Sequence, residues 1–254
     1  MSQKIDINVD MGESFGRYVL GDDEALMPYV TSANIATGFH AADPVVMEQT
    51  VKWAAQYGVA PGAHVGLPDM RGFGRRRIDI SPSELRGDVL YQLGALEAFL
   101  KVHGLKMQHI KPHGILYRMV GEEDRYIEPF LDACADYNPE LIIMLHQGCE
   151  ALKRAEERGL PTAHEILIDL GYDAQGNWLL ERVKQARSPE EVAARALRAV
   201  TEGVIDTIDG GDVPVQGVTV CIHGDAPNAP AVAKAVHSAL IAAGVTPASL
   251  TEPT

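Results

Sequence analysis

Histidines and carboxylates recur in this chain at points where short apolar or alternating segments end. In the stretch 32–44, an expected buried strand over 33–38 is followed by His40, and Asp43 with Pro44 then begins a helix. A carboxylate N-cap followed by proline is a strong signal for a helix start. Equivalent endings follow six other expected strands, at Asp10, His64, His113, His146, Asp169 and His223.

These seven ionisable side chains point to one site. Helical patterns separate the expected strands, and this alternation is typical of a parallel sheet. In parallel α/β folds the functional site lies beyond the carboxyl ends of the strands. Five of the nine histidines fall at such ends. We therefore expect an enzyme active site there, although any single histidine could instead be a hydrogen-bonded structural residue.

The strand faces expected to point inward are also polar. Residues two apart on a strand share a face. Three expected strands group polar residues in this way: Asp6, Asn8 and Asp10; His109, Lys111 and His113; Glu165 and Asp169. A barrel filled only for stability would carry Val, Ile and Leu there, and a buried ion costs several kcal/mol unless it is paired. We interpret these polar faces as functional.

For two groups of residues, a purely structural role is an alternative to a functional one. Arg75 and Arg76 lie in a glycine-containing loop and are candidates for binding a phosphate or carboxylate, because arginine makes bidentate contacts to such groups. An ordinary solvated loop is the alternative. Asp43 and Asp225 each precede an expected helix, so N-capping alone could explain them.

The expected fold is α/β, with one domain over 1–254. The expected strands are 4–10, 33–38, 59–64, 107–113, 141–145, 164–169 and 218–223, with a short last strand at 245–246; the expected helices are 22–30, 44–57, 81–104, 122–137, 149–158, 188–202 and 227–243. Residues 209–212 are typical of a hairpin turn. Seven or eight strand–helix units suit a closed or nearly closed β/α barrel. An open doubly wound sheet is the alternative, although the Rossmann glycine motif is absent.

Composition excludes several classes of protein. Of the 254 residues, 46% are hydrophobic and 22% are charged, as in soluble globular domains. The formal charge of −13 argues against binding to nucleic acid or to an anionic membrane surface. No apolar run approaches the ~18 residues of a membrane span, and no signal peptide is recognisable. Cys134, Cys149 and Cys221 are expected to be buried free thiols of a cytoplasmic protein.

Several common catalytic motifs are missing from the sequence. It contains no P-loop, no G-x-S-x-G, no H-E-x-x-H and no paired C-x-x-C. A transition metal stays an open alternative, because clustered histidines and carboxylates bind Zn²⁺ or Mn²⁺. The candidate ligands are His40, His64 and Asp10.

Six motifs together resemble the LamB/YcsF family over nearly the whole chain. They are DINVDMGE at 6–13, SANIATGFHAADP at 32–44, GAH at 62–64, GFGRR at 72–76, KPHGILY at 111–117 and HGD at 223–225. The resemblance implies a variant, distorted β/α barrel of the glycoside hydrolase/deacetylase type. It also implies the opening of the 5-oxoproline lactam to glutamate with hydrolysis of ATP, in a complex with two partner subunits.

The chain departs from the family pattern near the sixth expected strand. The pattern Glu-x-Phe-Ala-Asp-Arg is here Glu165 to Leu170, so leucine replaces an arginine suited to holding a carboxylate. The turn after Arg182 also lacks the usual Gly-Ala, and Ala42 replaces a glycine. A related lactam or cyclic amide is therefore an alternative substrate.

The implied reaction suggests roles for the polar residues. Opening a lactam needs a base for water, a cation for the developing negative charge and an acid for the leaving nitrogen. Asp10 or Asp169 is the expected base, and Lys111 is the expected cation. His113 or His223 is the expected acid. The expected substrate-binding residues are Asn8, Glu13, Asn34, His40, His64, Arg75, Arg76, Glu165 and Asp225.

ATP, with Mg²⁺, is the co-substrate that the resemblance implies, and a homo-oligomer is an open alternative for the assembly. Two other classes of function also stay open. One is a metal-dependent deacetylase or amidohydrolase that acts alone on a related cyclic amide. The other is a non-catalytic subunit of a lactam-utilisation complex, against which the dense ionisable rim argues.

Overall fold

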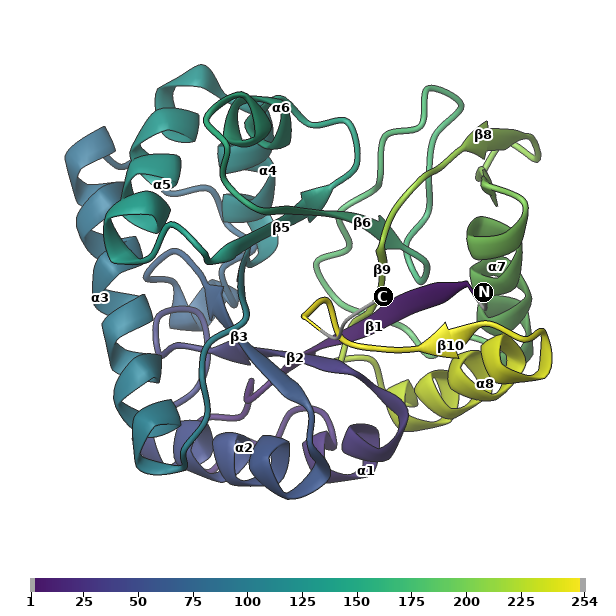
Figure 1. The fold of residues 1–254 in the computed structure, drawn as a ribbon, viewed down its shortest axis with the longest axis horizontal. Coiled ribbons are helices and arrows are strands. Elements are labelled where there is room, and N and C mark those ends of the chain that lie inside the picture. Colours follow the sequence, from purple (N-terminus) through teal and green to yellow (C-terminus); the bar gives the residue numbers. More distant parts are fainter. Residues whose placement is uncertain (1–2, 252–254) are drawn as a thin grey trace.

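The computed structural model describes residues 3–251 and shows a closed barrel of parallel strands (Figure 1). Seven strands pair in the order β1-β2-β3-β4-β5-β6-β9, and β9 pairs back with β1. Their bounds are β1 Lys4–Met11, β2 Ser32–Ala36, β3 Ala60–Val65, β4 His109–Pro112, β5 Ile142–His146, β6 Thr162–Leu167 and β9 Thr219–Ile222. The short β10, Thr246–Pro247, pairs with the start of β1. The predicted barrel is confirmed, and the open sheet is excluded.

Helices surround the barrel on its outside (Figure 1). They are α1 Asp23–Leu26, α2 Pro44–Tyr57, α3 Pro82–Val102, α4 Gly114–Glu122, α5 Asp124–Tyr137, α6 Glu150–Glu157, α7 Pro189–Thr201 and α8 Ala229–Ala242, with 3₁₀ turns η1 Met27–Tyr29 and η2 Met70–Gly72. Within residues 3–251, no helix is long and apolar enough to cross a membrane.

The structure corrects the expected elements at three places. Helix α4 was not expected at all, because it is short and carries Gly114 and Gly121 near its ends. The expected helix 22–30 divides into α1 and η1 around Pro28. The sixth strand ends at Leu167, so Asp169 lies in the loop beyond it. The predicted hairpin at 209–212 is confirmed, and it joins β7 Val204–Asp206 to β8 Asp212–Pro214.

Helix starts follow the capping signals of the sequence. The Ser81 hydroxyl accepts from the Glu84 N–H at 3.2 Å, and the Glu84 carboxylate accepts from the Ser81 N–H at 2.6 Å. Asp43 accepts from two N–H groups of the first turn of α2, so its role is structural. Asp225 does not cap α8, whose N-cap is Asn228. The capping alternative for Asp225 is therefore wrong.

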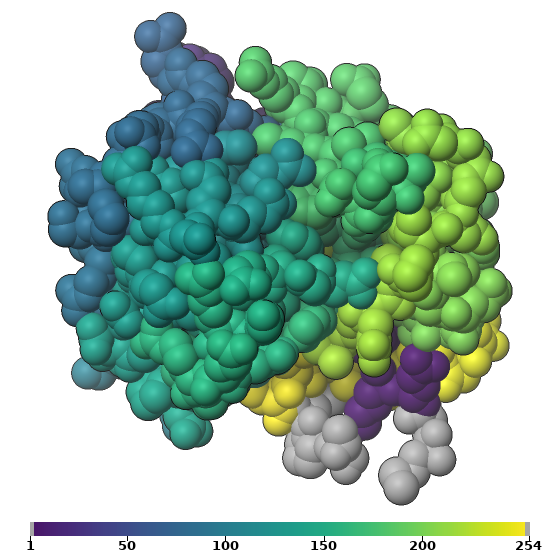
Figure 2. All heavy atoms as spheres, turned by 90° about the horizontal axis from the view of Figure 1, so that it is seen from above, coloured from purple at the N-terminus to yellow at the C-terminus, as the bar shows by residue number. Residues whose placement is uncertain are grey.

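The apolar core lies between the strands and the helices. Helix α3 buries one stripe, as its 3–4 spacing predicts, and the stripe consists of Leu85, Val89, Leu93, Leu96 and Leu100. The three cysteines are buried free thiols. Figure 2 shows the segments around 66–80, in blue, and 171–187, in green, rising at the edge opposite the start of β1. These loops follow the carboxyl ends of β3 and β6, so they border the expected site.

Two valines on α3 test the packing of the core. Val89 is 0% exposed and Val102 is 76% exposed. Val89→Ala should lower the free energy of unfolding by about 1.5–3 kcal/mol, because it removes buried methyl groups and leaves a cavity. Val102→Ala changes the same atoms on the same helix without burial and should cost less than about 0.5 kcal/mol. Urea denaturation measures both, and equal losses would contradict the packing described here.

Candidate active site

The interior of the barrel is polar at its amino end. The Asp6 carboxylate accepts from the hydroxyls of Thr31 at 2.6 Å and Ser32 at 2.7 Å, and from that of Thr219. Burial raises the pKa of Asp6 to about 6, and these hydroxyl donors limit the rise. All of these partners are neutral donors, so this layer satisfies a buried carboxyl group and joins β1, β2 and β9.

Asparagines and a histidine form the next layer. The Asn34 amide donates to Asn8 Oδ1 at 2.7 Å and to Asp10 Oδ1 at 2.8 Å. His109 Nε2 donates to Asn34 Oδ1 at 2.7 Å. Burial, aided by the charge of Lys111, lowers the pKa of His109 to about 3. Asn8 and Asn34 therefore lie beneath the expected site, where Asn34 holds Asp10 directly and Asn8 holds Asn34.

Lys111 lies at the centre of the barrel and is 2% exposed. Its ammonium is 3.0 Å from Asp10 Oδ1 and 2.8 Å from Glu165 Oε1, and it donates to Cys221 Sγ at 2.9 Å. Burial alone would lower the pKa of Lys111, but Asp10, with Cys221 and Glu165 beside it, raises that pKa well above its usual value. Lys111 therefore stays a cation. The Tyr117 hydroxyl donates to the other Glu165 oxygen at 2.6 Å.

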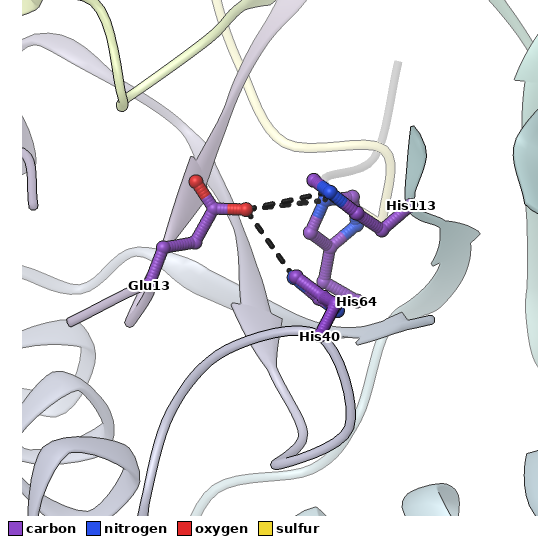
Figure 3. A group of neighbouring side chains, drawn as sticks. All are labelled: Glu13, His40, His64 and His113. Carbon is purple, nitrogen blue, oxygen red and sulfur yellow. Dashed lines mark hydrogen bonds and ion pairs between the residues drawn. The ribbon is translucent and has the colours of Figure 1, made fainter. Parts of the chain in front are cut away.

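Three histidines and one carboxylate point toward one another in Figure 3. Asp10 adjoins this cluster through His64. Glu13 Oε1 is 3.3 Å from His40 Nε2 and 3.3 Å from His113 Nδ1, and it is 3.9 Å from His64 Nε2. All four side chains are buried. They come from the ends of β1, β3 and β4 and from the loop after β2, so only the closed barrel brings them together.

Backbone carbonyls determine which histidine nitrogens face the centre of this cluster. His64 Nδ1 donates to the Lys111 carbonyl at 2.9 Å, and His113 Nε2 donates to the Phe73 carbonyl at 2.8 Å. His64 Nε2 and His113 Nδ1 then face each other at 2.9 Å. Two lone pairs repel at this distance, so either a proton or a metal cation must lie between them. Asp10 Oδ2, 3.3 Å from His64 Nε2, favours either positive charge.

The cluster fits a three-ligand zinc site. Tetrahedral Zn²⁺ with bonds of about 2.0–2.1 Å holds its ligand atoms about 3.4 Å apart, and the distances among Glu13, His64 and His113 range from 2.9 to 3.9 Å. His40 stacks on His113 with a centroid separation of 3.8 Å and an interplanar angle of 3°. One ion cannot lie in the plane of both stacked rings. Of these two histidines, His113 has its second nitrogen held by a carbonyl, as metal-bound histidines do, whereas Nδ1 of His40 has no hydrogen-bond partner in the described residues.

The histidine of β9 forms a separate pair with a carboxylate. His223 Nδ1 is 2.8 Å from Asp169 Oδ1, and the His223 N–H donates to Asp169 Oδ2 at 2.9 Å. Burial opposes ionisation of Asp169, but His223 and Lys184 outweigh it, so the pKa of Asp169 lies well below its usual value. The other ring nitrogen of His223 lies 3.9 Å from Asp10 Oδ2. Asp169 therefore orients His223 toward Asp10.

Arg75 and Arg76 are neighbours in the loop after β3, but one lies at the site and the other at the surface. Arg75 is buried, pairs with Asp225 at 2.7 Å and donates to the Arg182 carbonyl at 3.0 Å. Arg76 pairs with Asp69, and its side chain is 58% exposed. The structure therefore brings Arg75 and Asp225 to the site but leaves Arg76 outside it.

A narrow pocket opens onto these groups. Its polar wall includes Asp10, Lys111, His113 and His223, whereas an apolar wall comes from the loops after β6. The pocket is lined by Asp10, His64, Arg75, Lys111, Pro112, His113, Gly114, Tyr117, Leu167, Leu170, Trp178, Leu180, Glu181, Lys184 and His223. His146, predicted to join the rim, lies instead beside Trp178 in a neighbouring surface hollow.

Sequence reasoning missed two kinds of site residue. Trp178, Leu180 and Lys184 come from an irregular loop, where no periodicity marks an inward side chain. Tyr117 and Cys221 are uncharged residues within a helix and a strand, where nothing in the sequence marks them as site residues. Their contacts with Glu165 and Lys111 appear only in the folded structure.

The family profile described as LamB/YcsF family matches residues 5–254. The chain belongs to this family. A protein from Clostridium beijerinckii, named as the A subunit of 5-oxoprolinase, is 45% identical over 225 residues, which cover 87% of this chain and 88% of that protein. The crystal structure of a lactam utilization protein from Thermus thermophilus has a TM-score of 0.89 and 40% identity, over 98% of this chain and 100% of that chain.

A more distant structure is similar in fold alone. A family 4 carbohydrate esterase from Streptomyces lividans has a TM-score of 0.51 and 12% identity, over 98% of this chain and 93% of that chain. The variant β/α barrel that the family resemblance implies is thus confirmed.

The burial of His109 predicts a pH-dependent stability. The folded protein keeps His109 neutral down to about pH 3, whereas the unfolded chain protonates it near 6.5. The unfolded state binds more protons in this window, so the free energy of unfolding falls as the pH falls. When the pH falls from 6 to 5, the free energy of unfolding should drop by about 1.2 kcal/mol more in the wild type than in His109→Gln. Urea denaturation measures this, with half-buried His164→Gln as the control, and parallel pH profiles of wild type and His109→Gln would contradict it.

The histidine cluster predicts zinc binding that depends on His64. Titration of Zn²⁺ into metal-free protein should give one binding site. His64→Ala should lower the zinc affinity by more than about 100-fold, because loss of a residue that only hydrogen-bonds to a metal ligand already lowers metal affinity 10- to 100-fold. Acid should also weaken binding, since protons compete for the same nitrogens. His164→Ala, on the outside of the barrel, should bind as the wild type does. A wild type that binds no zinc would show that a proton occupies the cluster instead.

Proposed function

We propose that this chain is the lactam-binding subunit of a 5-oxoprolinase, which opens 5-oxoproline to glutamate with hydrolysis of ATP. The observation that carries the proposal is the pocket in which Asp10, Lys111 and His223 meet beside an apolar wall. Relatives that are 41–45% identical are named as the A subunit of 5-oxoprolinase, and the word subunit supports a complex with partner proteins.

The chemistry requires activation of the amide. A five-membered lactam is an unstrained amide, and transfer of the terminal phosphoryl group of ATP to its oxygen makes the ring carbon electrophilic. Water then adds to that carbon, the carbon–nitrogen bond breaks, and the nitrogen gains a proton. The resulting acyl phosphate reacts with a second water to give glutamate and phosphate. The reaction therefore needs a proton acceptor, a fixed cation and a proton donor.

Three side chains suit these needs. Lys111 remains a cation and lines the pocket, so it can stabilise negative charge that develops on the substrate. Burial opposes ionisation of Asp10, but the attraction of His64 and Lys111 outweighs it and keeps the pKa of Asp10 well below its usual value. Asp10 is therefore ionised and can accept a hydrogen bond from the attacking water.

His223 is better placed than His113 to donate the proton. Both nitrogens of His113 contact other groups in the protein, at the Phe73 carbonyl and at His64. His223 uses only Nδ1 for Asp169, and its side chain is 14% exposed. Its Nε2 can thus exchange a proton with a ligand, while Asp169 acts by orientation.

A metal-dependent amidohydrolase is the second candidate function. The convergence of Glu13, His64 and His113 favours it, since such a set leaves a zinc coordination position open. Bound zinc would supply a Lewis acid and an activated water. This candidate predicts lactam hydrolysis by the isolated chain without ATP.

The test is release of ADP that depends on 5-oxoproline, measured on the complex reconstituted with partner subunits. Lys111→Met should lower turnover by about 100-fold or more, because the fixed cation is lost. His223→Gln should lower it as well, with the neutral amide keeping the hydrogen bond to Asp169.

Lys153→Met, on the exposed face of α6, is the matched control. Unfolding curves must show that each variant folds. Wild-type turnover in folded Lys111→Met and His223→Gln would refute the assigned roles, and ATP-independent turnover would favour the amidohydrolase.

A further inference from the structure

One cation in the active-site pocket has neither a hydrogen-bond nor an ion-pair partner among the described residues. Lys184 lines the pocket and is 8% exposed, and its ammonium nitrogen has no hydrogen-bond partner within residues 3–251. It lies in the irregular loop between Trp178 and α7. The charge of Asp169 acts on Lys184 from nearby, but no group in the described residues accepts a hydrogen bond from the ammonium. A buried ammonium with unmatched hydrogens is costly, so a ligand that supplies an anionic acceptor would relieve a cost already present in the free protein.

The other charges of the pocket are already matched. Lys111 is paired with Asp10 and Glu165, and Arg75 is paired with Asp225.

The other carboxylates near Lys184 are also engaged. Glu181 of the pocket pairs with Arg187, and Asp169, which lies behind His223 and does not line the pocket, is bound to His223. Lys184 makes no ion pair with any of these carboxylates in the described part of the chain. It is therefore the cation of the pocket that is available to a ligand.

The walls around Lys184 match a small cyclic acid. Leu167, Leu170, Leu180 and Trp178 form an apolar surface. Lys111 and His223 lie on the polar side. A ligand that matches the polar side, the apolar surface and Lys184 has a polar group to be transformed, a short hydrocarbon part and an anionic group. 5-Oxoproline has these as its amide, its two ring methylenes and its carboxylate.

We propose that Lys184 binds the carboxylate of the lactam substrate and thereby selects acidic lactams over neutral ones. The identification of the ring as a lactam rests on the proposed function. The ammonium and the carboxylate form a charge-assisted hydrogen bond, which is stronger than a hydrogen bond between neutral groups. Lys184 acts in binding and contacts no bond that breaks.

The test compares two lactams that differ only in the carboxylate, 5-oxoproline and 2-pyrrolidinone, in the complete complex. Lys184→Met should raise the KM for 5-oxoproline by about 10- to 100-fold, because it removes a hydrogen bond to a charged group. It should leave the KM for 2-pyrrolidinone unchanged. Lys184→Arg should restore part of the binding, and exposed Lys153→Met is the control. An unchanged KM for 5-oxoproline would overturn the proposal.

A phosphate group is the other anion that Lys184 could meet. In that case Lys184→Met would raise the KM for ATP and impair both lactams equally, and this result would also overturn the proposal.

Direct binding separates this proposal from the proposed function. Cyclopentanecarboxylate has the ring and the carboxylate but no lactam, so its binding to the full chain needs no turnover. Calorimetry should detect this binding with the wild type, and the affinity should be lower by about 10-fold or more with Lys184→Met. A complex that turns over no lactam would refute the proposed function, while this measurement would still decide the role of Lys184. Equal affinities, or no binding to wild type, would overturn that role.

Discussion

The site depends on one buried cation. Lys111 enters the barrel from β4 and meets Asp10 of β1 and Glu165 of β6 at ion-pair distance. Taking three charges out of water is expensive, and their mutual attraction repays this only where the geometry is good. Loss of the ammonium would remove the cation that these two carboxylates share. This constraint explains why strands from opposite sides of the barrel must keep their register for the site to exist.

The polar interior is built in layers, each of which supports the next. Asp6 is satisfied by hydroxyl groups, and above it Asn34 receives His109 and donates to Asp10. These contacts join β1 to β2 or to the residue before it, and β2 to β4. The barrel thus gives up part of the apolar packing that would stabilise it, and the apolar layer between strands and helices provides the compensating burial.

The histidine cluster illustrates how backbone groups prepare side chains for chemistry. Carbonyls of Lys111 and Phe73 fix the tautomers of His64 and His113, so two lone pairs point at one location beside Glu13. A proton and a metal ion compete for this position. The same convergence makes the site acid-sensitive, because protons bind the nitrogens that a metal would use.

Much of the barrel and of its rim could be predicted from the order of the residues. Strand–helix alternation requires a parallel sheet, and the period of two on β1 places Asp6, Asn8 and Asp10 on one face. Capping signals located α2 and α3 within a residue or two, because they act locally. The short α4 escaped prediction, since nine residues with two glycines carry little helical signal.

Which rim residues meet depends on the packing of the folded chain. Arg75 and Arg76 are adjacent in sequence, yet one is buried against Asp225 and the other points to solvent. Their difference comes from contacts with residues about 150 positions away and with Asp69 nearby, which no local pattern encodes. Lys184 lies in an irregular loop, where side-chain direction depends on the packing of the whole barrel rather than on a repeating backbone geometry.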